Sequence, residues 1–175
     1  DNKVRFFSLL ERESLLNTFF TSRLIPINKF DVNFYDIVND LNNILKIKDG
    51  LLKVDLVDDG SKKEILEIDF GIGGDYFETV ISPKCYNYNY IDNYINLMLG
   101  LPVKEKKVPD SELYFDYVYN INKSKNLIMD YDKIFYVADK YFQDYEIIKI
   151  KKQDDKVKYP TSNMDAAFGI IHNNK

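Results

Sequence analysis

The stretch that decides the fold is residues 51–82, LLKVDLVDDGSKKEILEIDFGIGGDYFETVIS. Apolar residues alternate with polar ones over 52–56 and again over 66–72, which is the period of a strand with one face in water. Between them, residues 58–61 (DDGS) supply side chains that tolerate a positive φ and favour a turn. Residues 76–82 fit a third strand, which Pro83 ends. The stretch therefore predicts an antiparallel meander.

Helical spacing of apolar residues appears on both sides of this meander. Three segments show it, namely residues 4–24, 34–46 and 88–99. Pro26 follows the first segment and Gly50 the second, and both residue types commonly stand just beyond a helix end. The change from helical period to period two around Gly50 indicates that helices come first and a sheet follows.

The remainder of the chain continues the sheet beyond a solvated loop at 101–111. The expected segments are strands at 113–121 and 127–129, a helix or a further strand at 132–142, a hairpin of 146–152 with 156–159, and a short helix within 162–172. The loop at 101–111 is the one candidate domain boundary. A length of 175 residues fits one domain at roughly 100–200 residues each. We expect a single α+β domain over 1–175, an antiparallel sheet with helices packed on one face.

Composition excludes several classes of protein. The formal net charge is −4 and the pI is near 5.1, whereas a general nucleic-acid binder needs a basic footprint. No apolar run approaches the roughly 18–20 residues that span a bilayer. The single cysteine, Cys85, rules out an internal disulfide and a zinc site built on several thiolates. No direct nucleic-acid contact, membrane span or cofactor is therefore expected, and the oligomeric state is open.

Catalytic motifs find little support. The glycines of 71–74 are followed by Asp75 and Glu78, whose charge repels phosphate, so a turn is favoured over a phosphate-binding loop. Cys85 and the single histidine, His172, are not placed together by any pattern, and His172 falls in a tail that is expected to fray. We therefore predict no catalytic residues, and an enzyme is less favoured than a binding protein.

A divalent-metal-dependent nuclease or hydrolase is the alternative that uses the acidic residues of the 58–69 region. Glu67 and Asp69 are two residues apart and share a strand face. Magnesium chemistry needs such carboxylates, usually with a lysine beside them. The residue two beyond Glu67 is an aspartate and not a lysine. A solvated strand face is favoured and no metal is expected.

Charge placement is the most informative feature. Residues 49–82 carry nine acidic residues and three lysines, a net charge of −6 against −4 for the whole chain. Such a patch steers association with a basic partner, or else keeps the sheet soluble and its edge unpaired. On the first interpretation the partner-binding surface includes these acidic residues: Asp55, Asp58, Asp59, Glu67, Asp69 and Glu78. Charge alone leaves both interpretations open.

Tyrosines with asparagines crowd residues 86–94. Tyrosine suits interfaces because it offers a large rigid area with one polar tip, and it also suits a half-buried sheet. We include Tyr88 and Tyr90 in the predicted partner-binding set.

The acidic hairpins of 52–82, centred on residues 67–72 (EIDFGI), and the Tyr/Asn-rich segment after them give the chain a general resemblance to bacterial toxin-immunity proteins, including those of contact-dependent growth inhibition. The resemblance implies tight binding to a cognate toxin, often a nuclease, in the cytoplasm of the producing cell. Our leading hypothesis is therefore a protein that neutralises a basic toxin domain by covering its active surface. A secreted interaction domain of a pathogen is a further alternative, favoured if a signal peptide precedes Asp1.

Overall fold

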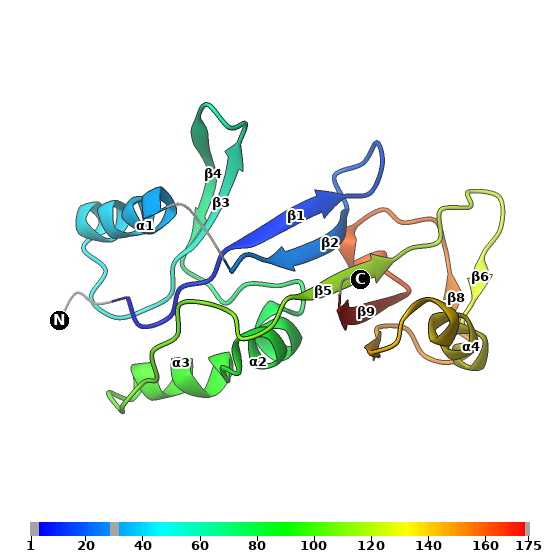
Figure 1. Cartoon of the computed structure of the whole chain (residues 1–175). Helices are drawn as coiled ribbons and strands as arrows, with labels where there is room; N and C mark the ends of the chain where they lie inside the picture. The colour runs from blue at the N-terminus through cyan, green and yellow to red at the C-terminus, as the bar shows by residue number, and fades with distance from the viewer. Residues whose placement is uncertain (1–3, 29–31, 174–175) are drawn as a thin grey trace. The chain divides into compact units, whose positions relative to one another are not determined.

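The computed structural model describes residues 4–28 and 32–173 and has the expected α+β architecture, with an antiparallel main sheet (Figure 1). The chain divides into two compact units. The first consists of Asp1–Phe7 and Lys29–Asp110, and the second of Ser8–Asn28 and Ser111–Lys175. The last of the three breaks in the chain, between Asp110 and Ser111, falls inside the loop at 101–111 that the sequence marked as a candidate boundary. Two compact units in one chain can either fold together as one domain or fold separately as two. The prediction of a single domain therefore stays a prediction.

The second unit is built on a five-stranded sheet in which every neighbouring pair is antiparallel. Figure 1 shows β1, β2, β5 and β9 side by side. In spatial order the strands are β1 (Leu10–Ser14), β2 (Thr21–Pro26), β5 (Leu113–Val118), β9 (Phe168–Asn173) and β7 (Tyr145–Lys149). The C-terminal strand β9 therefore lies inside the sheet, between β5 and β7.

Helix α4 (Tyr131–Tyr141) packs on one face of this sheet. Asp130 caps its start by accepting a hydrogen bond from the Lys133 N–H. Ala138 of the helix shares a buried cluster with Ile147 of β7 and Ile170 of β9. A small sheet of β6 (Leu127–Ile128) with β8 (Lys156–Val157) and a 3-10 turn, η2 (Asn163–Asp165), complete the unit.

The first unit combines α1 (Val32–Leu45), the β3–β4 hairpin (Lys53–Asp58 with Lys63–Asp69), a π-helical turn η1 (Phe77–Ile81), α2 (Ser82–Tyr86) and α3 (Tyr90–Met98). An aromatic core supports it. Phe6 stacks on Tyr88 with ring centroids 4.4 Å apart and meets Tyr90 edge-on at 5.5 Å. Such ring pairs add to the free energy of burial.

The sequence prediction is wrong at residues 4–24, which form β1 and β2 and not a helix. Apolar doublets such as Phe19-Phe20 fit both periods, and pairing with β5, some ninety residues later, decides for strands. Between the strands Asn17 takes a positive φ of 58°, and the Thr18 hydroxyl donates to the Leu15 carbonyl. Phe19, expected to face inward, is 99% exposed at this turn.

The expected third strand at 76–82 is also wrong, since these residues form η1 and the start of α2. Asp75 and Tyr76 both have positive φ, 60° and 58°, which breaks an extended run. Pro83 stands in the first turn of α2, where its missing N–H costs nothing. It therefore opens a helix instead of ending a strand.

The last predicted hairpin is wrong in its pairing. Strand β7 pairs with β9, and β8 pairs with β6, so the two predicted partners lie in different sheets. The tail forms β9 after the 3-10 turn, and His172 is buried and not frayed. Residues 132–142, left open by the sequence, belong to helix α4. The expected helices at 34–46 and 88–99 and the strands at 52–56, 66–72, 113–121 and 127–129 are confirmed, with shifted ends.

Every helix of the described residues is too short or too polar to cross a membrane.

Candidate functional site

The β3–β4 hairpin of the first unit sorts its side chains onto two different faces. Lys53 pairs with Asp69 and Asp55 with Glu67, and a bulge at Leu66 then brings Leu56 opposite Ile65. Because side chains alternate along a strand, these pairings place an acidic face opposite an apolar one. The acidic face carries Lys53, Asp55, Val57, Glu64, Glu67 and Asp69. The apolar face carries Val54, Leu56, Ile65 and Ile68, with Asp58 and Lys63 at its end.

Two acidic residues stand at facing positions of the two strands on the acidic face. Asp55 of β3 stands opposite Glu67 of β4, and like charges at facing positions destabilise a ladder. Lys53 neutralises part of this negative charge, since its ammonium lies 3.3 Å from the Asp55 carboxylate. Glu67 is exposed, and Asp55 and Asp69 are partly exposed. The face thus presents more negative charge to solvent than its own lysine balances.

The aspartates at the tip serve the turn. Asp58 accepts a hydrogen bond from the Gly60 N–H and pairs with the Lys63 ammonium at 3.2 Å, and both lower the pKa of Asp58. The Ser61 hydroxyl and then the N–H groups of Ser61 and Lys62 lower the pKa of Asp59. Such bonds hold a turn closed. Of the two, Asp58 belongs to the apolar face.

That apolar face has a neighbour in the first unit. The Lys63 ammonium lies 4.8 Å from the centre of the Phe34 ring of α1. A cation at this distance over an aromatic ring is held by the charge distribution of the ring. Figure 1 shows the hairpin as a two-stranded ribbon next to α1. Ile65 and Ile68 of the apolar face are still 43% and 37% exposed, so both faces of the hairpin reach solvent.

Two residues of the predicted partner-binding set are buried. Glu78 is 5% exposed and Tyr88 is 4% exposed, so neither belongs to the surface as the structure presents it. Burial raises the pKa of Glu78, although its carboxylate accepts a hydrogen bond from the Gly73 N–H. Burial raises the pKa of Tyr88 to about 12. Tyr90 is half-buried against Phe6 and Phe77, so it belongs mainly to the aromatic core.

Apolar side chains close in sequence to Glu67 and Asp69 are exposed. Leu66 at the bulge is 67% exposed, and Phe70 and Ile72 beyond β4 are 56% and 47% exposed. Exposed apolar residues beside a charged patch are typical of protein-binding surfaces. Sequence alternation assigned Leu66 and Phe70 to the inside of the meander, and the bulge with the missing third strand explains why they are outside.

The part of the chain that the structure describes shows no set of metal ligands for the alternative of a divalent-metal-dependent nuclease or hydrolase. Over residues 4–28 and 32–173 the structure brings no three histidine, cysteine, aspartate or glutamate side chains into a group that could hold a metal ion. The acids of the 58–69 region are instead spread over the two faces and the turn of the hairpin.

Cys85 and His172 belong to different units, the first and the second. Cys85 is buried, and burial raises the pKa of its thiol to about 12. A thiol that stays protonated at neutral pH is a poor nucleophile. The surroundings of Cys85 therefore argue for a packing role, in line with the prediction that the two residues are not catalytic partners.

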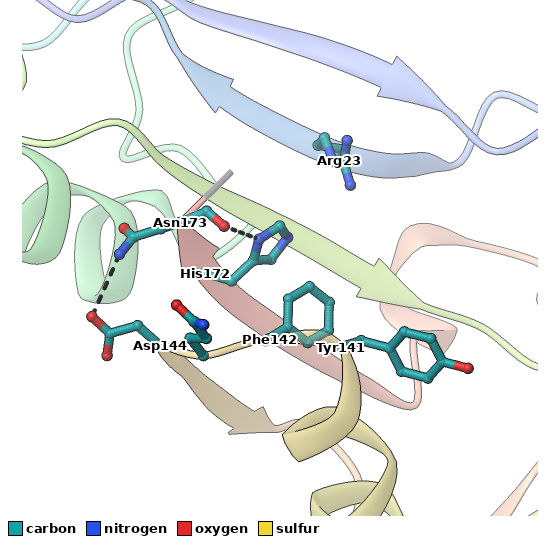
Figure 2. A pocket seen from close by; sticks show the side chains of 7 residues that line it. Arg23, Tyr141, Phe142, Asp144, His172 and Asn173 are labelled. Carbon is teal, nitrogen blue, oxygen red and sulfur yellow. Dashed lines mark hydrogen bonds between the residues drawn. The ribbon is translucent and has the colours of Figure 1, made fainter. Parts of the chain in front are cut away.

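His172 lines a pocket of the second unit that the sequence did not predict, with a volume of about 370 Å³ (Figure 2). Arg23 donates from Nε and Nη2 to the two oxygens of Asp116, at 2.5 and 2.7 Å. His172 Nε2 lies 3.2 Å from Asp116 Oδ2, and Nδ1 lies 2.9 Å from the Asn173 carbonyl oxygen. Both ring nitrogens thus lie within hydrogen-bond distance of oxygen atoms of the same chain.

The pocket is a product of strand register. Arg23 pairs with Asp116 across β2 and β5, and His172 stands two residues from the partner of Asp116 on β9. Phe142, just beyond α4, closes over the imidazole with ring centroids 4.5 Å apart. Arg23 and Asp116 lie 93 positions apart in sequence, and no local pattern marks either one.

Comparisons with known proteins show a fold and no family. No protein-family model and no curated protein matches the chain. Among solved structures, phosphoribosylglycinamide synthetase from Anaerococcus prevotii matches with a TM-score of 0.65 at 12% identity, covering 93% of this chain and 42% of that one. The ATPase subunit of phosphoribosylaminoimidazole carboxylase from Aquifex aeolicus matches with a TM-score of 0.60 at 9% identity, covering 96% and 45%. The chain spans less than half of either protein, and at this identity the likeness concerns the fold alone.

Proposed function

We propose that this chain binds and neutralises a basic protein partner, most concretely a bacterial toxin domain, and that the acidic face of the β3–β4 hairpin contacts it. The observation that supports the proposal is the facing pair Asp55 and Glu67, with Asp69 next to Glu67 on the same strand. On this proposal the chain acts in the cytoplasm of the cell that carries the toxin.

The energetic argument starts from the free protein. Facing carboxylates cost stability in the isolated hairpin, and a cationic surface docked on them removes that cost. Complementary charge also raises the rate of encounter, an effect that falls as ionic strength rises. The acidic face would thus act in recognition more than in folding.

Affinity needs apolar contact as well as charge. Leu66, Phe70 and Ile72 offer exposed side chains within a few residues of Glu67 and Asp69 in the sequence. Interfaces commonly derive most of their binding energy from a few buried anchors, with charged groups around them setting orientation. We expect Phe70 to be such an anchor, because an aromatic ring offers more rigid area than the two aliphatic neighbours.

The test first examines the reading frames that neighbour the gene for this chain, and a basic toxin-like domain encoded there is used as the binding partner. The double variant Glu67→Lys, Asp69→Lys should lose at least about tenfold in affinity and show a shallower dependence on salt. Asp36→Lys with Asp40→Lys makes the same change of charge on two exposed positions of α1 in the same unit and is the matched control. Unchanged binding by the hairpin variant, with folding intact by circular dichroism, would exclude this face.

A further inference from the structure

A second charged feature lies in the other unit, where three lysines line one hollow. The hollow has a volume of about 200 Å³, and its lining includes Lys151, Lys156 and Lys158. Two of these flank Val157, which is buried in the core of the second unit. Lys156 of β8 and Lys158 just beyond the strand are both exposed, and both line the hollow together with Val157.

The positive charge of this hollow is not balanced by ion pairs. Within the described residues none of its three lysines forms a salt bridge, whereas five lysines elsewhere do: Lys53, Lys62, Lys63, Lys106 and Lys133. Tyr159, which also lines the hollow, has the Lys123 ammonium 5.0 Å from the centre of its ring. Like charges gathered in one concavity raise the local concentration of anions.

The one carboxylate in the lining is engaged within the chain. Asp165 accepts hydrogen bonds from the N–H of Thr161 at 2.8 Å, the Thr161 hydroxyl at 2.9 Å and the Ser162 N–H at 3.0 Å. These bonds, and more weakly the Lys151 ammonium, lower the pKa of Asp165. Lys151 also donates to the Met164 carbonyl at 3.3 Å. The charge of Lys151 is thus offset by Asp165, and two positive charges remain.

We propose that the hollow binds a phosphate group, as free phosphate or as a small phosphate monoester, held mainly by Lys156 and Lys158. A phosphate monoester carries about −1.5 to −2 at pH 7, which matches two cations, whereas a carboxylate would leave one unanswered. Lysine ammonium groups bind phosphate as point charges and need no fixed bidentate geometry.

The experiment titrates the ¹⁵N-labelled whole chain with inorganic phosphate, glycerol phosphate and acetate, at constant ionic strength kept with sodium chloride. We expect saturable shifts of the amides of 151–161 with both phosphates, and at least about tenfold weaker binding of acetate. The double variant Lys156→Gln, Lys158→Gln should lose at least about tenfold in phosphate affinity. The control Lys133→Gln, Lys140→Gln removes the same charge from α4 and should retain it.

Three outcomes would overturn the proposal. They are the absence of saturable shifts with either phosphate, acetate binding equal to phosphate, or the same loss of affinity in the α4 control as in the Lys156 and Lys158 variant. Both lysines of the test pair are exposed, so the variant should keep the spectrum of the folded chain outside the hollow. The single variant Lys158→Gln repeats the test with the loss of only one positive charge, and we expect it to lose less phosphate affinity than the double variant.

Discussion

Removing one carboxylate from the acidic face should make the free hairpin more stable. Glu67 stands opposite Asp55, so Glu67→Gln keeps the size and shape of the side chain and removes the charge repulsion. Glu64→Gln is a matched control on the same strand and the same face. Glu64 faces Val57 and is ion-paired with Lys62, so its charge is not opposed by a carboxylate.

The size of the effect follows from the geometry. Facing charged pairs change the stability of a ladder by roughly 0.2–1 kcal/mol. Lys53, 3.3 Å from Asp55, already offsets part of the repulsion, and Glu67 is exposed to screening by salt. We therefore expect Glu67→Gln to raise the free energy of local opening by about 0.5 kcal/mol, which slows exchange about twofold.

The assay is amide hydrogen exchange of β3 and β4, which reports opening of the hairpin itself and not of the whole chain. The gain from Glu67→Gln should shrink at about 1 M salt, where the screening length falls to about 3 Å. Exchange in Glu67→Gln as fast as in the unmodified chain, or an equal gain in Glu64→Gln, would refute the facing-charge argument.

Three other expectations concern buried groups. The Cys85 thiol, buried and with its pKa raised to about 12, should resist iodoacetamide at about pH 8 in the folded chain and react once the chain is unfolded in urea. Gly169→Ala should cost about 1–3 kcal/mol by urea titration, since its Cβ would lie 2.6 Å from the buried Phe115 ring, while Gly74→Ala, with open space around it, should cost little. Burial raises the pKa of Glu78, so the folded chain binds the proton of this carboxyl group more tightly than the unfolded chain does. The protonated carboxyl group therefore contributes to stability in acid, and this contribution is lost as pH rises through the raised pKa. Glu78→Gln should therefore gain stability relative to the unmodified chain between about pH 4 and about pH 7, and a constant difference across that range would contradict the assignment.

Period and turn chemistry in the sequence determined the local elements that depend on neighbours in the chain. The hairpin of 53–69 is an example, because its turn residues hydrogen-bond within four positions and apolar residues alternate with polar ones over part of each strand. Helices α1 and α3 followed from apolar spacing for the same reason. The acidic character of the hairpin was also visible in the sequence, as was the boundary loop at 101–111.

Tertiary structure decided whatever depends on partners far along the chain. Phe6–Leu24 has apolar doublets that suit a helix, whereas in the structure Thr21–Pro26 pairs both with β1 close by and with β5 some ninety residues later. Alternation cannot reveal the bulge at Leu66, yet that single extra residue sets which acids share a face. Arg23, Asp116 and His172 meet only through the register of three strands, so their network has no local signature in the sequence. Local hydrogen bonds depend on a few neighbouring residues, whereas strand register and burial depend on the free energy of the whole packed chain.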